Sequence, residues 1–211
     1  MTENITVNEQ NSIQIKDSQG MIYIDPFRIQ NHPKDAAYIF ITHDHYDHFS
    51  PEDIEKVACE KTIMIVPEKM EKKAQKEAGM ISRIVTVKPG MQTEIGGIKF
   101  ETVAAYNRLK PFHPKSAGWV GYIFLTDGKG VYVAGDTDAT EEAAAVKCDI
   151  ALVPVGGTYT MDAKKAAELV NKINPEVAIP VHYGSVVGSP KDGAEFAENV
   201  KAPVRVEIKI R

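Results

Sequence analysis

The segment Phe40–Phe49 reads FITHDHYDHF, and it holds three of the six histidines of the chain with two aspartates among them. An apolar run, AYIFIT, leads into it and is typical of a buried strand. Ser50, Pro51 and Asp53 follow it in the order that starts a helix, with a cap, a first-turn proline and a capping-box acid. The chain must therefore fold so that this polar cluster joins a buried strand to a capped helix.

The spacing of four polar side chains in the motif suits metal binding. His43 and His45 leave the strand two residues apart, so an extended backbone points both to the same side. The turn toward Ser50 would bring Asp47 and His48 to the same space from another direction. Imidazole and carboxylate suit zinc and similar divalent metals. A surface histidine tract that binds metal by accident is the alternative, but it would not need a strand and a helix to fix its geometry.

Two further candidate ligands follow later apolar strands. Asp136 comes after VYVAG, where Gly135 permits a tight backbone, and it is either a ligand or a helix cap. Because Asp138 already has capping-box spacing with Glu141, we interpret Asp136 as a free carboxylate that can bridge two ions. His182 ends PEVAIPV. Alone it would be a core or loop histidine, but with the other residues it is a candidate ligand.

Composition limits the class of protein. A chain of 211 residues with 43% hydrophobic residues suits one domain, and we expect a single domain over residues 1–211. The net charge of −4 and the lack of a basic run argue against a nucleic-acid partner. No apolar run approaches membrane-spanning length, so we expect a soluble, cytoplasmic protein without a membrane partner. Cys59 and Cys148 match no paired spacing.

Strand-like and helix-like segments alternate along the chain, which favours sheets covered by helices over an all-β or all-α domain. The expected strands are SIQIK, MIYID, AYIFIT, TIMIV, RIVTV, IKFETVAAY, WVGYIFL, VYVAG, IALVPV, EVAIPV and VRVEIKI. The expected helices span residues 51–58, 68–78, 140–146, 161–173 and 191–200, with Thr160 as the cap of the fourth.

These motifs together resemble the metallo-β-lactamase superfamily. The resemblance rests on H-x-H-x-D-H after a strand, on Gly135-Asp136 after a later strand and on the histidine near the C-terminus, and it spans Asp25 to His182. It implies an α/β (α+β) fold, a four-layered αβ/βα sandwich of two mixed sheets flanked by helices. It also implies one or two zinc ions, with Mn²⁺ or iron as alternative metals. The implied ligands are His43 and His45 for the first ion, Asp47, His48 and His182 for the second, and Asp136 between them.

The short chain and the run GGTYTMDAKKAAELV, followed by IPVHYG, look like a compact group of metal-dependent hydrolases related to ascorbate-6-phosphate lactonases. The nucleic-acid-processing branches carry an inserted domain for which this chain has no room. A di-iron redox branch usually has glutamate at the position of His45, so this residue argues against it.

One position departs from the family pattern. The third histidine of the first metal usually stands where this chain has Asn107, whose amide oxygen is a poor zinc ligand. His113 lies six positions later in NRLKPFHPK. Three interpretations stay open: His113 replaces the missing ligand, it contacts substrate, or it is a plain loop histidine between two prolines.

The same loop carries a substrate clue. Arg108, Lys110 and Lys115 surround His113 and would favour a small anionic substrate, unless they are only solvated surface charges. Asn107, Lys110, His113 and Lys115 are therefore candidate substrate-binding residues. Asp25, at the end of MIYID, resembles the early aspartate that supports a metal ligand in the family, or it only begins the turn at Pro26.

We therefore expect a metal-dependent hydrolase that uses a metal-bound hydroxide on an ester, lactone or phosphodiester bond. Asp47 and Asp136 are its candidate catalytic carboxylates. The alternatives are a di-iron redox protein on the same scaffold and a non-catalytic metal-binding module, for which Asn107 is the best support. The sequence is compatible with a homo-oligomer but does not fix the oligomeric state.

Overall fold

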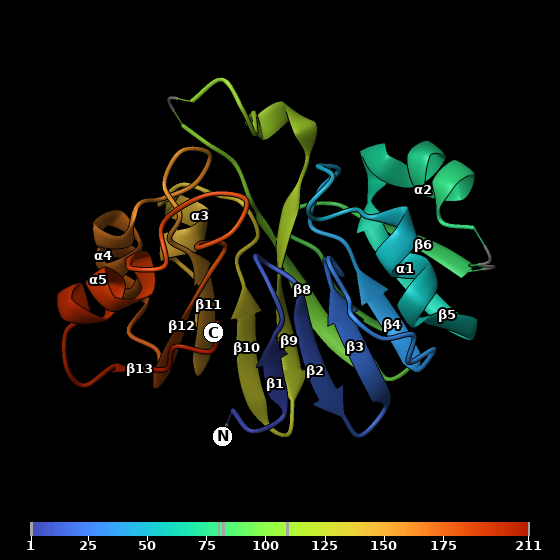
Figure 1. Ribbon diagram of the computed structural model, residues 1–211, viewed down its shortest axis with the longest axis horizontal. Coiled ribbons are helices and arrows are strands. Elements are labelled where there is room, and N and C mark those ends of the chain that lie inside the picture. The colour runs from blue at the N-terminus through green and yellow to red at the C-terminus, as the bar shows by residue number, and fades with distance from the viewer. Residues whose placement is uncertain (1, 80, 82, 109, 211) are drawn as a thin grey trace.

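A computed structural model describes residues 2–79, 81, 83–108 and 110–210. Two mixed β-sheets pack face to face, and helices cover the outer face of each (Figure 1). Helices α1 and α2 cover the sheet that is blue and cyan in Figure 1, and α3, α4 and α5 cover the sheet that runs from green to red. The predicted four-layered α/β sandwich is thereby confirmed.

The first sheet has the strand order β1-β2-β3-β4-β5-β6. β1, β2 and β3 pair antiparallel, whereas β3 to β6 pair parallel. The strands are β1 (Ile5–Val7), β2 (Ile13–Asp17), β3 (Gly20–Ile24), β4 (Ala36–Phe40), β5 (Ala58–Pro67) and β6 (Arg83–Val87).

The second sheet has the order β13-β12-β11-β10-β9-β8-β7, parallel from β13 to β10 and antiparallel from there to β7. Its strands are β7 (Gln92–Ile95), β8 (Ile98–Ala104), β9 (Val120–Thr126), β10 (Lys129–Val133), β11 (Ile150–Pro154), β12 (Val177–Val181) and β13 (Arg205–Val206).

The helices are short. None in the described part of the chain combines the length and the apolar character that a membrane crossing needs. They are α1 (Pro51–Val57), α2 (Glu71–Glu77), α3 (Glu141–Ala144), α4 (Ala163–Ile173) and α5 (Asp192–Asn199), with 3₁₀ turns η1 (Glu68–Met70) and η2 (Lys115–Ala117).

The space between the two sheets is filled by one apolar core. Phe40 of β4 packs edge-on against Phe100, Tyr122 and Phe124 of the opposite sheet, with ring centroids 4.8–5.1 Å apart. Edge-to-face aromatic pairs add to the free energy gained by burying their area. This core fixes the two sheets relative to each other, and so fixes the loops that follow their strands.

Several predicted element boundaries differ from the structure. The strands β1 and β7 were not predicted, since the first is only 3 residues long and the second, QTEI, is mostly polar. Within VRVEIKI only Arg205 and Val206 pair with β12. The predicted cap Thr160 is wrong: α4 begins at Ala163, and the side chain of Asp162 accepts the capping hydrogen bond from the Lys165 amide.

The predicted start of α1 is confirmed. The Ser50 side chain accepts a hydrogen bond from the amide of Asp53, and Pro51 occupies the first turn. The Asp53 carboxylate in turn accepts from the backbone amides of Arg28 and Ile29. The helix that follows the histidine motif is therefore tied to the loop after β3.

Candidate metal centre

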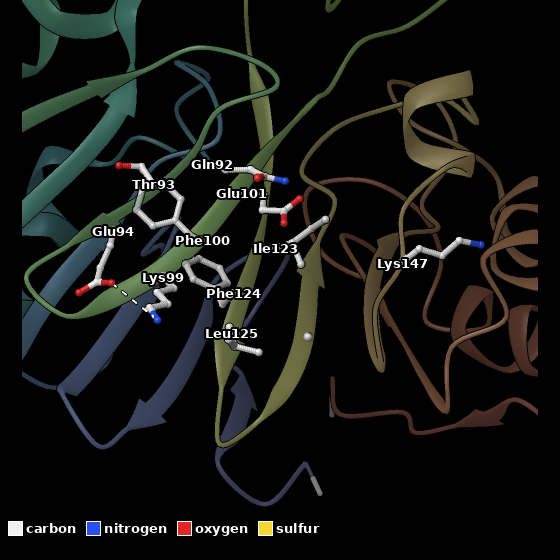
Figure 2. A pocket seen from close by; sticks show the side chains of 11 residues that line it. Gln92, Thr93, Glu94, Lys99, Phe100, Glu101, Ile123, Phe124, Leu125 and Lys147 are labelled. Atoms are coloured by element: carbon white, nitrogen blue, oxygen red, sulfur yellow. Dashed lines mark ion pairs between the residues drawn. The ribbon is translucent and has the colours of Figure 1, made fainter.

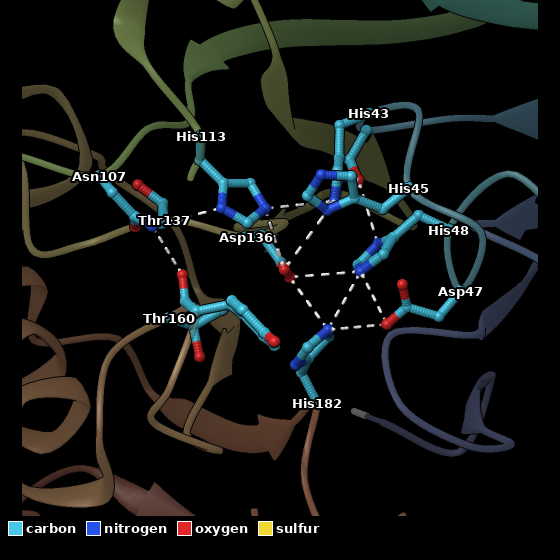
Figure 3. A network of polar contacts seen from close by, with 12 residues as sticks. His43, His45, Asp47, His48, Asn107, His113, Asp136, Thr137, Thr160 and His182 are labelled. Atoms are coloured by element: carbon cyan, nitrogen blue, oxygen red, sulfur yellow. Dashed lines mark hydrogen bonds and ion pairs between the residues drawn. The ribbon is translucent and has the colours of Figure 1, made fainter. Parts of the chain in front are cut away.

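The ends of four strands meet at one place and deliver polar side chains to it (Figure 3). The histidine motif follows β4, Asp136 follows β10, His182 follows β12 directly, and His113 lies in the loop after β8. Gly135 has φ +63°, and a Cβ atom there would lie 3.0 Å from the Thr42 Cβ, so the sequence needs glycine before Asp136.

The first half-site consists of His43, His45, His113 and one oxygen of Asp136. His43 Nε2 lies 3.2 Å from His45 Nδ1 and 3.4 Å from His113 Nε2. Asp136 Oδ2 lies 3.3 Å from His113 Nε2 and 3.8 Å from His43 Nε2. One ligand atom from each of the four residues lies within 4.8 Å of the others.

The second half-site consists of Asp47, His48, His182 and the other oxygen of Asp136. His182 Nε2 lies 3.1 Å from His48 Nε2 and 3.3 Å from Asp47 Oδ2. Asp136 Oδ1 lies 3.3 Å from Nε2 of both histidines. The two oxygens of one buried carboxylate therefore face two different groups of imidazoles.

These separations fit divalent cations. Tetrahedral ligands at about 2.0–2.1 Å from a zinc ion lie about 3.3–3.4 Å from one another. Most of the nitrogen and oxygen separations in both half-sites are 3.1–3.4 Å. Asp136 Oδ1 is buried and accepts no hydrogen bond from any described residue. A buried oxygen of that kind is costly unless a cation or water completes it.

A family model described as the beta-lactamase superfamily domain matches residues 4–182. The chain belongs to the metallo-β-lactamase superfamily. The match begins before β1 and ends on His182, so it includes every residue of both half-sites.

Curated relatives place the chain in one branch of that superfamily. A protein from Thermoplasma acidophilum, named a UPF0173 metal-dependent hydrolase, is 31% identical over 176 residues, covering 78% of this chain and 76% of its own. A protein of the same name from Aeropyrum pernix is 32% identical over 186 residues, covering 81% and 76%. The chain therefore belongs to the UPF0173 metal-dependent hydrolases.

Solved structures have the same fold. A crystal structure from Parabacteroides distasonis is 31% identical with a TM-score of 0.81, covering 98% of this chain and 93% of that one. Igni18, a metallo hydrolase from Ignicoccus hospitalis, has a TM-score of 0.79 at 22% identity, covering 98% and 94%. The second likeness concerns the fold alone.

The histidines of the two half-sites differ in proton affinity. Burial lowers the pKa of His43 well below its usual value, and the positive charge of His48 lowers it further. Burial and the nearby His113 also lower the pKa of His45. Burial alone would lower the pKa of His48 too, but the charges of Asp136 and Asp25 outweigh it and raise the pKa to about 9. His48 therefore holds a proton that a metal would have to displace.

Both site carboxylates stay ionised. Burial raises the pKa of Asp136, but the charges of His182 and His48 outweigh it and hold the pKa well below the usual value. For Asp47, burial likewise raises the pKa, while the hydrogen bond from His182 and the charge of His48 lower it by more. Ionised carboxylates are the form that binds a cation.

Asp25 supports the second half-site from behind. Its Oδ2 atom lies 2.7 Å from His48 Nδ1 and accepts hydrogen bonds from Thr42 Oγ1 and Asn11 Nδ2. The position has φ +47° and lies in the turn after β3. A carboxylate on Nδ1 orients the ring so that Nε2 points toward the cluster.

The structure places His113, not Asn107, in the first half-site. Asn107 Nδ2 donates a hydrogen bond to the Tyr159 carbonyl and lies 3.2 Å from His113 Nδ1. If His113 binds a metal through Nε2, its proton lies on Nδ1 and needs an acceptor. The Asn107 side chain would then have to rotate so that its oxygen faces Nδ1, and it would give up the hydrogen bond to Tyr159. Asn107 therefore contacts a candidate ligand and is not one itself.

Two of the expected substrate-binding cations have acidic partners. Lys110 Nζ lies 2.8 Å from Asp138 Oδ1, and Lys115 forms an ion pair with Glu142. Asp138 is not the cap of α3 as predicted: Thr140 caps that helix, and Asp138 holds the loop of Lys110. Asp136 nevertheless does not cap α3, so its carboxylate is available to the cluster.

Sequence reasoning missed Trp119. Its ring lies 4.9 Å from that of His43 and 5.1 Å from those of His45 and His113, measured between centroids. It is the one tryptophan of the chain. Nothing in its neighbourhood, GWVGY, pointed to a site.

Three of the eight described non-glycine residues with positive φ have side chains that belong to the site or contact it. Asp25, His113 and His182 have φ values of +47°, +62° and +58°, which side chains other than glycine rarely adopt. Such positions cost free energy and persist where the surrounding structure enforces them, often at functional sites. Gly156 lets the backbone pass close to His182, because a Cβ atom there would lie 2.3 Å from the His182 carbonyl oxygen.

Proposed function

We propose that this metallo-β-lactamase relative is a zinc-dependent hydrolase that cleaves an ester, lactone or phosphodiester bond of a small molecule. The observation that carries the proposal is Asp136, whose two oxygens face the two half-sites at 3.3 Å from His113 on one side and His182 on the other. A single carboxylate placed in this way suits a pair of cations.

The residues divide into two sets of ligands. His43, His45 and His113 would hold one cation, Asp47, His48 and His182 would hold the other, and Asp136 would contact both. A bound zinc supplies an activated water at neutral pH and polarises the oxygen of the bond to be cleaved. Nitrogen-rich sites favour zinc over the harder magnesium or calcium, with manganese and iron as the competing metals.

The chain's own residues would contribute charge and order. Asp47 and Asp136 are ionised at neutral pH, so they offset the charge of the cations. Asp25 holds the His48 ring in place from its Nδ1 side. The small anionic substrate expected from Arg108, Lys110 and Lys115 stays a prediction, with less support now that both lysines have acidic partners.

The proposal is tested by metal analysis joined to a substrate panel. Protein purified without added metal should contain zinc, and zinc-loaded protein should hydrolyse at least one lactone, ester or phosphodiester. His45→Ala should lower both zinc content and rate, whereas His32→Ala, at an exposed histidine outside the cluster, should change neither. Iron with visible absorbance would contradict the zinc assignment. Hydrolysis of none of the substrates would favour a non-catalytic metal-binding module.

A further inference from the structure

A cavity of about 560 Å³ opens directly onto the metal centre. Four of its lining residues belong to the two half-sites, namely His45, Asp47, Asp136 and His182. A molecule whose reacting bond lies at the cluster would therefore extend the rest of its structure into this cavity. A second hollow, of about 490 Å³, lies over β7 to β10, and none of its lining residues belongs to the cluster (Figure 2).

The walls of the cavity are apolar and aromatic. They consist of Tyr46, Phe112, Tyr159, Val186 and Val187, together with Thr158. Five large hydrophobic side chains are exposed in the described part of the chain, and three of them, Tyr46, Phe112 and Tyr159, line this one cavity. Exposed apolar side chains gathered at one hollow mark a binding site, since scattered ones are normal.

The lining contains His45 and His182 but no lysine or arginine. Lys110 and Lys115 lie outside it and have acidic partners, and the exposed Arg108 is not a lining residue either. The carboxylates of the lining are Asp47 and Asp136, which belong to the half-sites. An anionic group among the apolar lining residues would find no lysine or arginine side chain there.

The walls are held in place by contacts of their own. The rings of Phe112 and Tyr159 pack edge-on with centroids 5.1 Å apart. Tyr46 packs edge-on against Phe27 at 6.0 Å. A preformed apolar cavity binds an apolar group without first having to order its own side chains.

We infer that this cavity selects substrates whose group beyond the reacting bond is uncharged and apolar, such as an alkyl ester of an aromatic carboxylic acid. The inference rests on the proposed function, because it takes the reacting bond to lie at the metal centre. In the reaction, the oxygen of water bonds to the ester carbonyl carbon, the C–O bond to the alcohol breaks, and the alkoxide leaves with a proton. The products are a carboxylic acid and an alcohol.

Binding of two matched amides tests the inference without any turnover. N,4-dimethylbenzamide is uncharged, whereas N-methyl-4-sulfonatobenzamide carries a negative charge on a group that binds zinc weakly. Calorimetry with zinc-loaded protein should give a dissociation constant about tenfold lower for the uncharged amide. Phe112→Ala and Tyr159→Ala should each weaken its binding about tenfold, which is the loss expected for an aromatic contact.

Leu125→Ala is the matched control, since Leu125 is also exposed but does not line the cavity. It should leave binding of the uncharged amide within about twofold of the wild type. Zinc content confirms that each variant is folded, and Phe112→Leu replaces Phe112→Ala should the latter lose zinc. Equal binding of the two amides, or unchanged binding in the aromatic variants, would overturn the inference.

Hydrolysis of the corresponding methyl esters separates this inference from the proposed function. Methyl 4-methylbenzoate should have a kcat/KM at least about tenfold above that of its 4-sulfonate analogue. Equal hydrolysis of both esters would keep the proposed function and reject the selectivity. Hydrolysis of neither, with the predicted binding of the amides, would reject ester hydrolysis and keep the apolar cavity.

Discussion

Asp25 Oδ2 lies 2.7 Å from His48 Nδ1, and both side chains are fully buried. Asp25 follows β3, which contributes no residue to either half-site, and it orients His48 toward the second one. The carboxylate therefore acts through the histidine.

Asp25→Asn should weaken metal binding at the second half-site by about 10- to 100-fold, the usual cost of losing a carboxylate behind a histidine ligand. The physical reason is that an amide offers Nδ1 of His48 a weaker acceptor and no charge. Competition with a chelating dye measures the affinity. Asp127→Asn, in a turn outside the cluster, is the matched control, and equal affinities for the two variants would remove Asp25 from the site.

Trp119 should report occupancy of the first half-site. Its ring lies about as close to His43 as to His45 and His113, and no other tryptophan contributes emission. When zinc is added to metal-free protein, the fluorescence of Trp119 should change until the first half-site is saturated. His45→Ala should remove most of the change, whereas His182→Ala should keep it. The reverse pattern would mean that the half-sites are assigned wrongly.

Metal binding should release a proton from His48. Its pKa of about 9 means that it is protonated at neutral pH, and ligation through Nε2 requires the neutral ring. Affinity at this half-site should therefore fall about tenfold for each pH unit below 9. Calorimetry in buffers of different ionisation enthalpy counts the protons released at pH 7.5.

An NMR titration of the metal-free protein is the control for that experiment. The ring signals of His48 should titrate near pH 9. The ring of His43 should stay neutral into the acidic range, since burial lowers its pKa. A His48 signal that titrates at the usual value would contradict the predicted proton release.

The core between the sheets should carry much of the stability. Phe40→Ala should lower the free energy of unfolding by about 3–5 kcal/mol, because it leaves a cavity among three aromatic rings of the opposite sheet. Urea unfolding of the metal-free protein measures it. Leu125→Ala, at a side chain that is 56% exposed, should change the same quantity by less than about 0.5 kcal/mol. Equal losses would mean that Phe40 is not at the centre of the core.

Much of the fold followed from the sequence because its strands are apolar and its turns are marked. The two strands that sequence reasoning missed, β1 and β7, lie at the edges of the sheets, where pairing with one neighbour does not require an apolar pattern. The caps were harder. Asp138 and Thr140 both precede α3, and Thr160 and Asp162 both precede α4, and each of these side chains is of a kind that can cap a helix. Only the tertiary contacts decide that Thr140 and Asp162 are the caps.

Part of the candidate site could be predicted from the sequence, and part could not. Local spacing predicted that His43, His45, Asp47 and His48 lie together. The end of an extended strand points the two first histidines to one side, and the turn toward Ser50 brings the other two side chains to the same space. The place of His113 could not be decided, since it depends on how a loop returns after β8. Tyr46, Phe112 and Tyr159 gave no signal, because single aromatic residues in loops have no periodicity. The single domain, the cytoplasmic location, the absence of nucleic-acid and membrane partners and the oligomeric state stay predictions.

The central claim is that Asp136 joins two cation sites, and metal stoichiometry tests it most directly. Equilibrium dialysis against zinc followed by elemental analysis should find two ions per wild-type chain and at most one in Asp136→Ala. Asp127→Ala should keep the wild-type value. Two zinc ions bound to Asp136→Ala with unchanged affinity would contradict the account.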